Sequence, residues 1–336
     1  MKESKIRLAI ILPADKARKI RIPERIESIC KKKGIAVTTI DALNTVTIEG
    51  EFDVLLHKAL DFYNVEGMSS ESADEILKKV KVFIERNPKM VVIDDLESSR
   101  MMSNRKHCHN VMDTFSTDVG AISVFVPKSL EIPAGLSTAC VRELIQESKI
   151  RFPILAKPMD THNKQMSLIF SLDDLDDFET PSLVEEFYNH NGVMYKVFVM
   201  GDRYNVIQRP SIKDYSLSDY SVHKKPIKID SRNVSKMGRG FHPEIHHSDP
   251  AKQKWLNSFD NPDLLDRDVL KLLCKRMSEA SGLKMFGLDI LVVKETGNYA
   301  LVDINQFPGY KGVLDDVFAD NFVEMIVNSC HGVSLK

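Results

Sequence analysis

The sequence contains no apolar run long enough to cross a membrane. The longest run near its beginning, 8–12, is five residues, whereas a membrane-spanning helix needs roughly 20. Charged residues precede this run and no small-residue cleavage site follows it, so we expect no secretory signal. Cysteine is also sparse: the five cysteines are scattered singly, which argues against a disulfide framework or a cysteine zinc site. These features favour a reducing compartment, and we expect the cytoplasm, with the nucleus also compatible.

Glycine and proline are few, at 15 and 14 of 336 residues, which excludes collagen-like and low-complexity chains. Two common nucleotide-binding motifs, G-x-x-x-x-G-K-[ST] and G-x-G-x-x-G, are absent, as are H-E-x-x-H and G-x-S-x-G. The composition, 43% hydrophobic and 28% charged, is that of an ordinary globular protein. At about 150 residues per domain, the length predicts two or three packed domains.

The net charge is only -2, but basic residues gather in two segments. Residues 1–35 hold eleven Lys or Arg against four acids, and residues 196–240 hold ten against four. These segments could converge on one anionic ligand, or they could form separate solvated faces. Hydroxyl and cationic donors that suit phosphate oxygens interleave in and near the second segment, at Arg209, Ser211, Lys213, Ser231, Arg232, Ser235 and Lys236. Because no nucleic-acid-binding motif accompanies them, we favour a small polyanion over nucleic acid.

The order of predicted elements indicates an α/β (α+β) protein. The first third alternates strands and helices, which predicts a parallel sheet, with strands at 6–12, 35–40, 52–57 and 89–93 and helices at 23–33 and 69–86. Three short strands in the middle, which suggest antiparallel pairing, lie at 152–157, 166–171 and 182–187. The last part contains two predicted hairpins, 194–200 with 203–208 and 285–293 with 299–305, and helices at 250–257, 266–281 and 315–329.

The second hairpin brings two carboxylates together. If its turn centres near Thr296, Asp289 faces Asp303 directly, and Asn305 lies on the same face. Opposed like charges are destabilising unless something neutralises them, and an all-oxygen set suits Mg²⁺. The alternative is that both aspartates face solvent on an exposed hairpin. Apolar neighbours that we expect on the opposite face, and that argue for a core-packed strand, are Leu288, Ile290 and Val302.

Two lysines and a loop add further candidates for phosphate binding. Lys157 ends a strand, and Lys196 lies inside an apolar strand, where a lysine needs a partner or must extend to water. If the neighbouring strands flank a nucleotide, both lysines could contact phosphates; the alternative is a surface position for each. The loop 307–312 contains glycines that let backbone amides approach an anion, although a plain turn has the same composition.

Two long runs resemble the inositol 1,3,4-trisphosphate 5/6-kinase family, also called inositol-tetrakisphosphate 1-kinases. They are residues 186–211, EFYNHNGVMYKVFVMGDRYNVIQRPS, and residues 303–313, DINQFPGYKGV. Shorter similar segments lie at 54–58, 231–235 and 286–289, so that the resemblance spans nearly the whole chain in order. It implies the ATP-grasp fold. An N-terminal parallel-sheet α/β domain would precede two subdomains with largely antiparallel sheets, the three parts being 1–105, 106–187 and 188–336.

The resemblance implies an ATP-dependent kinase that transfers the γ-phosphoryl group to a hydroxyl of an inositol tris- or tetrakisphosphate, reversibly between inositol phosphates. Nucleotide-binding residues would be Arg105, Lys157, Lys196, Ser211, Ser231 and Ser235, with Glu185, Glu186 and Phe187 as the hinge that holds adenine through backbone groups. Two Mg²⁺ would bind Asp289, Asp303 and Asn305. The inositol phosphate would contact Lys16, Lys58, His162, Lys196, Arg209, Asn305 and Gly309, and the catalytic residues would be Lys157, His162 and Lys196. The loop 158–166 departs from the family, being shorter and without glycine.

Two other functions are compatible with the same fold. One is a carboxylate–amine ligase. The run 208–211, QRPS, and the excess of basic residues favour a polyphosphate acceptor over this alternative. The other is a non-catalytic nucleotide or polyphosphate sensor, which would have no need of the full set of metal ligands. We expect a monomer that acts on small inositol polyphosphates and binds neither nucleic acid nor a membrane.

Overall fold

Four parallel strands form the first sheet of the computed structural model, which describes residues 6–159, 164–175, 179–216, 219, 225–235 and 242–331. Its order is β2-β1-β3-β4, and every neighbouring pair is parallel. The strands are β1 (Ile6–Ile11), β2 (Ile35–Thr39), β3 (Val54–His57) and β4 (Val91–Ile93). The prediction of a parallel sheet in the first third is therefore confirmed.

Helix α3 (Ser70–Arg86) covers one face of this sheet. The Ser69 hydroxyl accepts a hydrogen bond from the Ser72 N–H and so caps the helix where the sequence predicts its start. Its apolar stripe packs against alternate residues of β1 and β3, and the buried members of the stripe are Ala73, Ile76, Val80 and Phe83.

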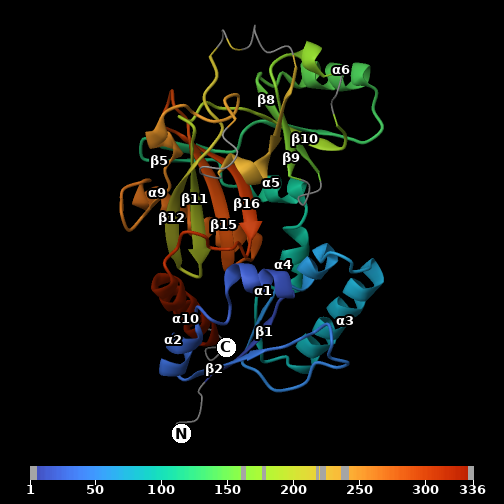
Figure 1. Ribbon diagram of the computed structural model, residues 1–336, viewed down its shortest axis with the longest axis vertical. Coiled ribbons are helices and arrows are strands. Elements are labelled where there is room, and N and C mark those ends of the chain that lie inside the picture. Colours follow the sequence, from blue (N-terminus) through green and yellow to red (C-terminus); the bar gives the residue numbers. More distant parts are fainter. Residues whose placement is uncertain are drawn as a thin grey trace.

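The other face is covered by a helix from the far end of the sequence. Helix α10 (Asp315–His331) packs on the parallel sheet beside α2 (Glu27–Lys32), as Figure 1 shows at the lower left. The Arg25 guanidinium lies 3.8 Å from the Phe318 ring centre, and its Nε lies 2.8 Å from Asp315 Oδ1. The first and last parts of the chain therefore share one hydrophobic core.

Two larger sheets form the upper part of the molecule in Figure 1. The five-stranded sheet has the antiparallel order β13-β9-β8-β10-β7. Its strands are β7 (Ser129–Ile132), β8 (Ile154–Pro158), β9 (Gln165–Ile169), β10 (Ser182–Glu186) and β13 (Ile227–Asp230). The predicted antiparallel pairing of the middle strands is confirmed.

The seven-stranded sheet has the order β14-β12-β11-β15-β16-β6-β5 and contains both predicted hairpins. Its strands are β5 (Thr117–Val119), β6 (Ile122–Phe125), β11 (Val193–Met200), β12 (Arg203–Pro210), β14 (Leu256–Asn257), β15 (Met285–Val292) and β16 (Tyr299–Gln306). Strands β5 and β6 precede residue 187 and β13 follows it, so each sheet draws strands from both sides of that expected boundary.

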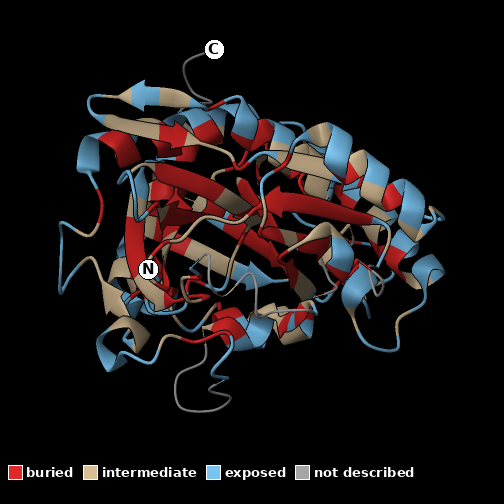
Figure 2. Ribbon diagram, turned by 90° about the horizontal axis from the view of Figure 1, so that it is seen from above, coloured by how far each residue is buried: buried red, intermediate tan, exposed pale blue. Residues whose placement is uncertain are grey.

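The remaining helices lie on the surfaces and at the junctions of the sheets. They are α1 (Ala14–Ile20), η1 (Ala59–Asn64), α4 (Leu96–Met101), α5 (Arg105–Asp113), α6 (Thr138–Ser148), η2 (Leu172–Asp174), α8 (Ser231–Val234), η3 (Pro250–Gln253) and α9 (Arg267–Ser281). Figure 2 shows buried residues concentrated on the central strands and exposed residues on the outer helices. None of the helices in the described ranges is long and apolar enough to span a membrane.

Two predicted helices differ from the structure. Residues 250–257 form the short 3₁₀ helix η3 followed by strand β14, because the edge of the seven-stranded sheet pairs with Leu256 and Asn257. The helix expected at 23–33 is shorter: turns occupy residues 21–26, and α2 begins at Glu27. Local propensity did not reveal the pairing of Leu256 and Asn257 with the sheet edge, which is a tertiary effect.

Candidate functional site

A cavity of about 440 Å³ lies between the five-stranded and seven-stranded sheets. Predicted site residues that line it are Arg105, Lys157, Glu185, Glu186, Phe187, Lys196, Arg209, Ser211, Ser231, Ser235, Asp289, Asp303 and Asn305. A larger hollow of about 580 Å³ lies between the β11–β12 turn, α9 and α10, but it contains none of the predicted residues that the structure describes. The smaller cavity is therefore the candidate active site.

The carboxylate pair on the floor of this cavity has the predicted register. Asp289 on β15 pairs directly with Asp303 on β16, and Asn305 pairs with Gly287 on the same face. The Asn305 side-chain amide donates a hydrogen bond to Asp303 Oδ2 at 2.9 Å. Burial is the main cause that raises the pKa of Asp289, and the charge of Asp303 raises it further. Two opposed carboxylates and an amide oxygen form a donor set that fits a hard divalent cation.

A β-bulge lies immediately beside this pair. The register shifts by one residue after Asp289, so that Ile290 pairs with Leu301 and Val302 is left as the extra residue. Val302 therefore packs on the cavity side with Leu291, whereas Leu288, Ile290 and Leu301 pack in the core on the other side. The prediction that Val302 points away from the carboxylates is wrong, because a regular hairpin has no such extra residue.

The two lysines on the cavity strands, buried Lys157 and half-buried Lys196, each contact a carboxylate. Lys196 pairs with Asp289 across the β11–β15 ladder, and its Nζ lies 2.9 Å from Asp289 Oδ1 without the alignment of a hydrogen bond. Lys157 forms an ion pair with Glu185 and donates a second hydrogen bond to the Val302 carbonyl at 3.1 Å. The bulge thus supplies an acceptor that ties Lys157 of one sheet to β16 of the other.

The expected hinge residues have partners within the chain. The Glu186 N–H donates to the Lys128 carbonyl and the Phe187 N–H donates to the Pro153 carbonyl, both at 2.9 Å. The Glu186 carboxylate accepts hydrogen bonds from Arg151, whose Nη2 lies 2.7 Å away. These bonds occupy two of the backbone donors in the hinge and fix its position between the sheets.

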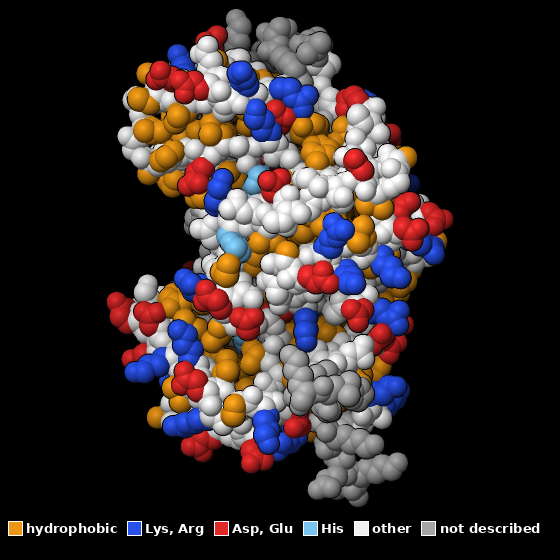
Figure 3. Space-filling view, turned by 180° about the vertical axis from the view of Figure 1, so that it is seen from behind, with side chains coloured by type: hydrophobic (Ala, Val, Ile, Leu, Met, Phe, Trp, Pro, Cys, Tyr) orange, Lys and Arg blue, Asp and Glu red, His pale blue; other side chains and the backbone are white. Residues whose placement is uncertain are grey.

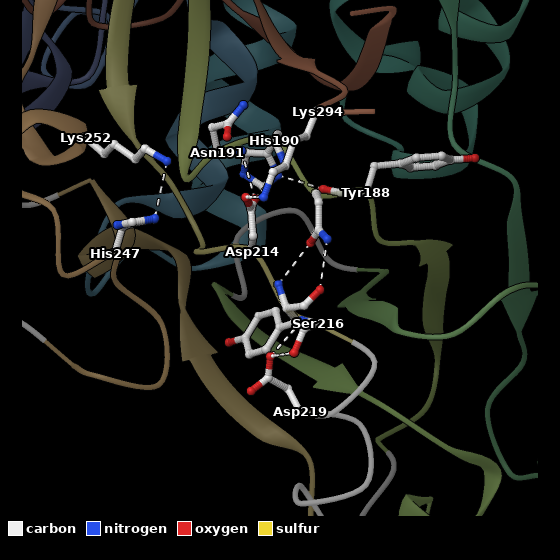
Figure 4. A network of polar contacts seen from close by, with 11 residues as sticks. Tyr188, His190, Asn191, Asp214, Ser216, Asp219, His247, Lys252 and Lys294 are labelled. Atoms are coloured by element: carbon white, nitrogen blue, oxygen red, sulfur yellow. Dashed lines mark hydrogen bonds and ion pairs between the residues drawn. The ribbon is translucent and has the colours of Figure 1, made fainter. Parts of the chain in front are cut away.

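A polar network behind the hinge was not predicted from the sequence (Figure 4). His190 is buried, which lowers its pKa, and its Nε2 lies 2.8 Å from Ser211 Oγ. The Asp214 carboxylate accepts hydrogen bonds from the N–H groups of His190 and Asn191 at 2.9 and 2.8 Å, and from Lys294 Nζ at 3.0 Å. The network joins the hinge, the loop after β12 and the β15–β16 turn. Only the position of His190 inside a polar run could have indicated it.

The other predicted nucleotide residues lie around the same cavity. Arg105, in the first turn of α5, donates from its Nε to the Pro158 carbonyl at 2.9 Å. The Ser235 hydroxyl donates to the Pro210 carbonyl at 3.0 Å. The Ser231 N–H donates to the Lys164 carbonyl at 2.9 Å and thereby ties α8 to the loop before β9.

The predicted substrate residues fall into three groups. Arg209 and Asn305 line the cavity, and Gly309 lies exposed in the loop that follows β16. Lys16 and Lys58 lie in the N-terminal part, where both form ion pairs with Asp61. Lys58 also donates to the Phe307 carbonyl at 3.1 Å, which places it beside that loop. His162 lies outside the described residues.

Comparison with known proteins identifies relatives along nearly the whole chain. The inositol 1,3,4-trisphosphate 5/6-kinase ATP-grasp domain matches residues 120–328, and the pre-ATP-grasp domain of that family matches residues 9–98. The chain is 29% identical over 315 residues to inositol-tetrakisphosphate 1-kinase of Danio rerio, covering 91% of this chain and 76% of the relative. It is 25% identical to inositol-tetrakisphosphate 1-kinase 1 of Arabidopsis thaliana, covering 90% of each chain.

Solved structures with a similar fold include ATP-grasp ligases. The ligase PsnB with a minimal precursor gives a TM-score of 0.60 at 12% identity, covering 96% of this chain and 100% of the other. D-alanine–D-alanine ligase from Bacillus anthracis gives 0.55 at 10% identity, covering 98% of each chain. Identities this low show the fold alone, and the ATP-grasp prediction is confirmed. Because both family domains match in order, the chain belongs to the inositol 1,3,4-trisphosphate 5/6-kinase family of ATP-dependent kinases.

Proposed function

We propose that this protein transfers the γ-phosphoryl group of ATP to a hydroxyl of an inositol tris- or tetrakisphosphate. The observation that carries the proposal is the row Lys196–Asp289–Asp303, which crosses three strands on the floor of the cavity between the two sheets. Phosphoryl transfer depends on positioning and charge neutralisation more than on covalent chemistry. A row that combines a cation with two metal-binding carboxylates suits that task.

ATP would lie between the sheets. Its adenine would be held by the apolar part of the cavity and by hinge backbone groups other than the bonded N–H groups of Glu186 and Phe187. Apolar side chains around it would be those of Leu155, Met166, Ile212, Val234 and Leu291. The His190 network would support the hinge from behind and orient the Ser211 hydroxyl. Lys157 and Arg105 both line the cavity, with Arg105 bonded to the carbonyl of Pro158 next to Lys157, and both would contact the phosphates.

Asp289, Asp303 and Asn305 would hold Mg²⁺, for which we propose two ions. When bound, Mg²⁺ supplies positive charge that neutralises the oxygens of the transferred phosphoryl group. Lys196 lies next to this set and would contact the same phosphoryl group, while its pairing with Asp289 keeps that carboxylate oriented. Asn305 is held by its hydrogen bond to Asp303, so its orientation is fixed as well.

The inositol phosphate would enter beside the loop 307–312, where the N-terminal part meets the seven-stranded sheet. Lys58 contacts that loop, and Lys16 shares Asp61 with Lys58, so both cations lie near the same entrance. Figure 3 shows Lys, Arg, Asp and Glu mixed over one face, without a large area of a single sign. We still predict that the protein is a cytoplasmic monomer and that it binds neither nucleic acid nor membranes.

The direct test is transfer of labelled phosphate from Mg-ATP to a panel of inositol tris- and tetrakisphosphates, with the product isomers separated by chromatography. A labelled product establishes the reaction class and identifies the hydroxyl. Consumption of ATP only when a carboxylate and an amine are supplied together would instead establish the ligase. ATP binding with no turnover on any acceptor would favour the sensor.

A further inference from the structure

The loop after β16 crosses the face of the seven-stranded sheet that carries Lys196 and Asp289, beside the cavity. Pro308 lies against Gly287 of β15, where a Cβ atom would be 3.3 Å from Pro308 Cγ. The Tyr310 hydroxyl, one strand further on, donates to the Val199 carbonyl of β11 at 2.8 Å. Glycine at 287 lets the loop pass this close to the sheet. The loop therefore carries its next residues towards β12.

Lys311 reaches the far edge of the cavity at the end of this crossing. Arg209 of β12 donates from Nη2 to the Lys311 carbonyl at 2.6 Å. The Arg209 guanidinium lies 4.4 Å, and Lys311 Nζ 4.8 Å, from the ring centre of Trp255. The indole N–H donates to the Ser235 carbonyl at 3.1 Å, which holds the ring in place. Two cations thus meet on the single tryptophan of the chain.

These two cations differ from the two lysines beside the carboxylate pair. Lys157 and Lys196 each form an ion pair with a carboxylate. Within the ranges that the structure covers, neither Arg209 nor Lys311 has a carboxylate at ion-pair distance, and the buried Arg209 Nε has no hydrogen-bond partner. Burial lowers the pKa of Arg209, and the attraction of Asp289 offsets this in part. Two cations on one aromatic ring leave an excess of positive charge that an anion would neutralise.

We propose that Lys311, Trp255 and Arg209 form a second phosphate subsite for the acceptor. Lys311 and Trp255 are the new members; the subsite would bind a phosphate group of the inositol ring other than the one being formed. It is placed on the acceptor side because the same loop carries Gly309 and contacts Lys58. The subsite makes acceptors with a phosphate at the matching ring position better substrates. This inference rests on the proposed kinase function.

The first test compares Lys311→Met with Lys254→Met. Lys254 is the matched control, because it is exposed and adjacent to Trp255 in sequence but does not line the cavity. For at least one inositol tetrakisphosphate, Lys311→Met is expected to raise KM about tenfold, the effect of one charge-assisted contact, and to leave kcat and the KM for ATP within about twofold. An isomer without the matching phosphate should show a much smaller change.

Three kinetic outcomes would overturn the subsite. One is an unchanged KM for every acceptor. Another is an equal rise in the KM for ATP, which would assign Lys311 to the nucleotide. The third is an equal rise in KM for all acceptors that Lys254→Met reproduces. It would indicate only the long-range electrostatic field of the protein.

The second test measures binding of the inositol phosphate in the absence of turnover. Because Trp255 is the only tryptophan, its fluorescence should change saturably when inositol tetrakisphosphate is added without ATP, and Lys311→Met should shift the midpoint about tenfold. If no acceptor is phosphorylated, the proposed function fails. The titration still decides the subsite, because a saturable response that Lys311→Met weakens supports it. An unresponsive Trp255 overturns it.

Discussion

Asp289 and Asp303 show at the scale of single residues why a sheet would tolerate opposed like charges. Asp289 is buried and its pKa is raised, so ionised Asp289 is unfavourable without a neighbouring cation. Lys196 supplies one positive charge at 2.9 Å. A divalent cation bound by both carboxylates would supply more. The carboxylate pair therefore lowers the stability of the fold when no metal is bound, and it would be useful for a metal-dependent transfer.

Asp303→Asn is expected to lower kcat at least about 100-fold, since it removes one of two negative ligands of the proposed metal site. The melting temperature in the absence of nucleotide should not fall, because the change removes a like-charge contact. Transfer assays and thermal unfolding measure the two effects. Asp202→Asn, in the exposed β11–β12 turn, is the control. Activity within a few-fold of the parent chain would remove Asp303 from the site.

At the scale of elements, α10 belongs to the fold of the N-terminal part. Its Phe318 and Phe322 are fully buried against the parallel sheet and α2. The two rings lie 6.1 Å apart and stacked, and Arg25 caps the first of them. The helix therefore completes a core whose other half lies about 300 residues earlier in the sequence.

Phe322→Ala should lower the free energy of unfolding by about 3–5 kcal/mol, through lost burial and the cavity it leaves. Asp320→Ala, on the exposed face of the same helix, should change it by less than about 0.5 kcal/mol. Urea denaturation followed by circular dichroism measures both. Equal small effects would mean that α10 is dispensable for the stability of the parallel sheet.

At the scale of the whole molecule, the N-terminal part is joined to the seven-stranded sheet by a buried carboxylate. Asp94, directly after β4, accepts hydrogen bonds from the N–H groups of Lys284 and Met285 at the start of β15. The Gln306 side chain, at the end of β16, donates to the Ser99 hydroxyl nearby. These contacts hold Lys16 and Lys58, for which we propose acceptor binding, in a fixed position relative to the carboxylate pair.

Burial raises the pKa of Asp94 to about 7. An acid whose folded pKa lies above its unfolded value of about 4 contributes stability that is full below pH 4 and is lost as pH rises through 7. The parent chain should therefore lose up to about 4 kcal/mol relative to Asp94→Asn between pH 4 and 7.5. Urea denaturation at several pH values measures this difference, with the exposed Asp260→Asn as control. A constant difference would show that Asp94 does not titrate in this range.

Much of the site could be predicted because it lies on local structure. The pairing of Asp289 with Asp303 follows from the length of one hairpin, and the Ser69 cap follows from a local pattern. The side on which Val302 packs could not be predicted, because a bulge depends on tertiary packing. It also depends on the hydrogen bond that the Val302 carbonyl accepts from the Lys157 ammonium. The His190–Asp214 network joins three segments separated by up to about 100 residues, so no local signal predicts it.

The sequence by itself determined the hairpins, the parallel first sheet and the family, because these depend on hydrophobic period, turn residues and contiguous runs. Only the tertiary structure decided that α10 covers the first sheet, that β13 joins the middle strands, and that Lys311 meets Arg209 on Trp255. Contacts of this kind join residues far apart in the chain. Their geometry is set by the packing of whole sheets and by the path of one loop across them.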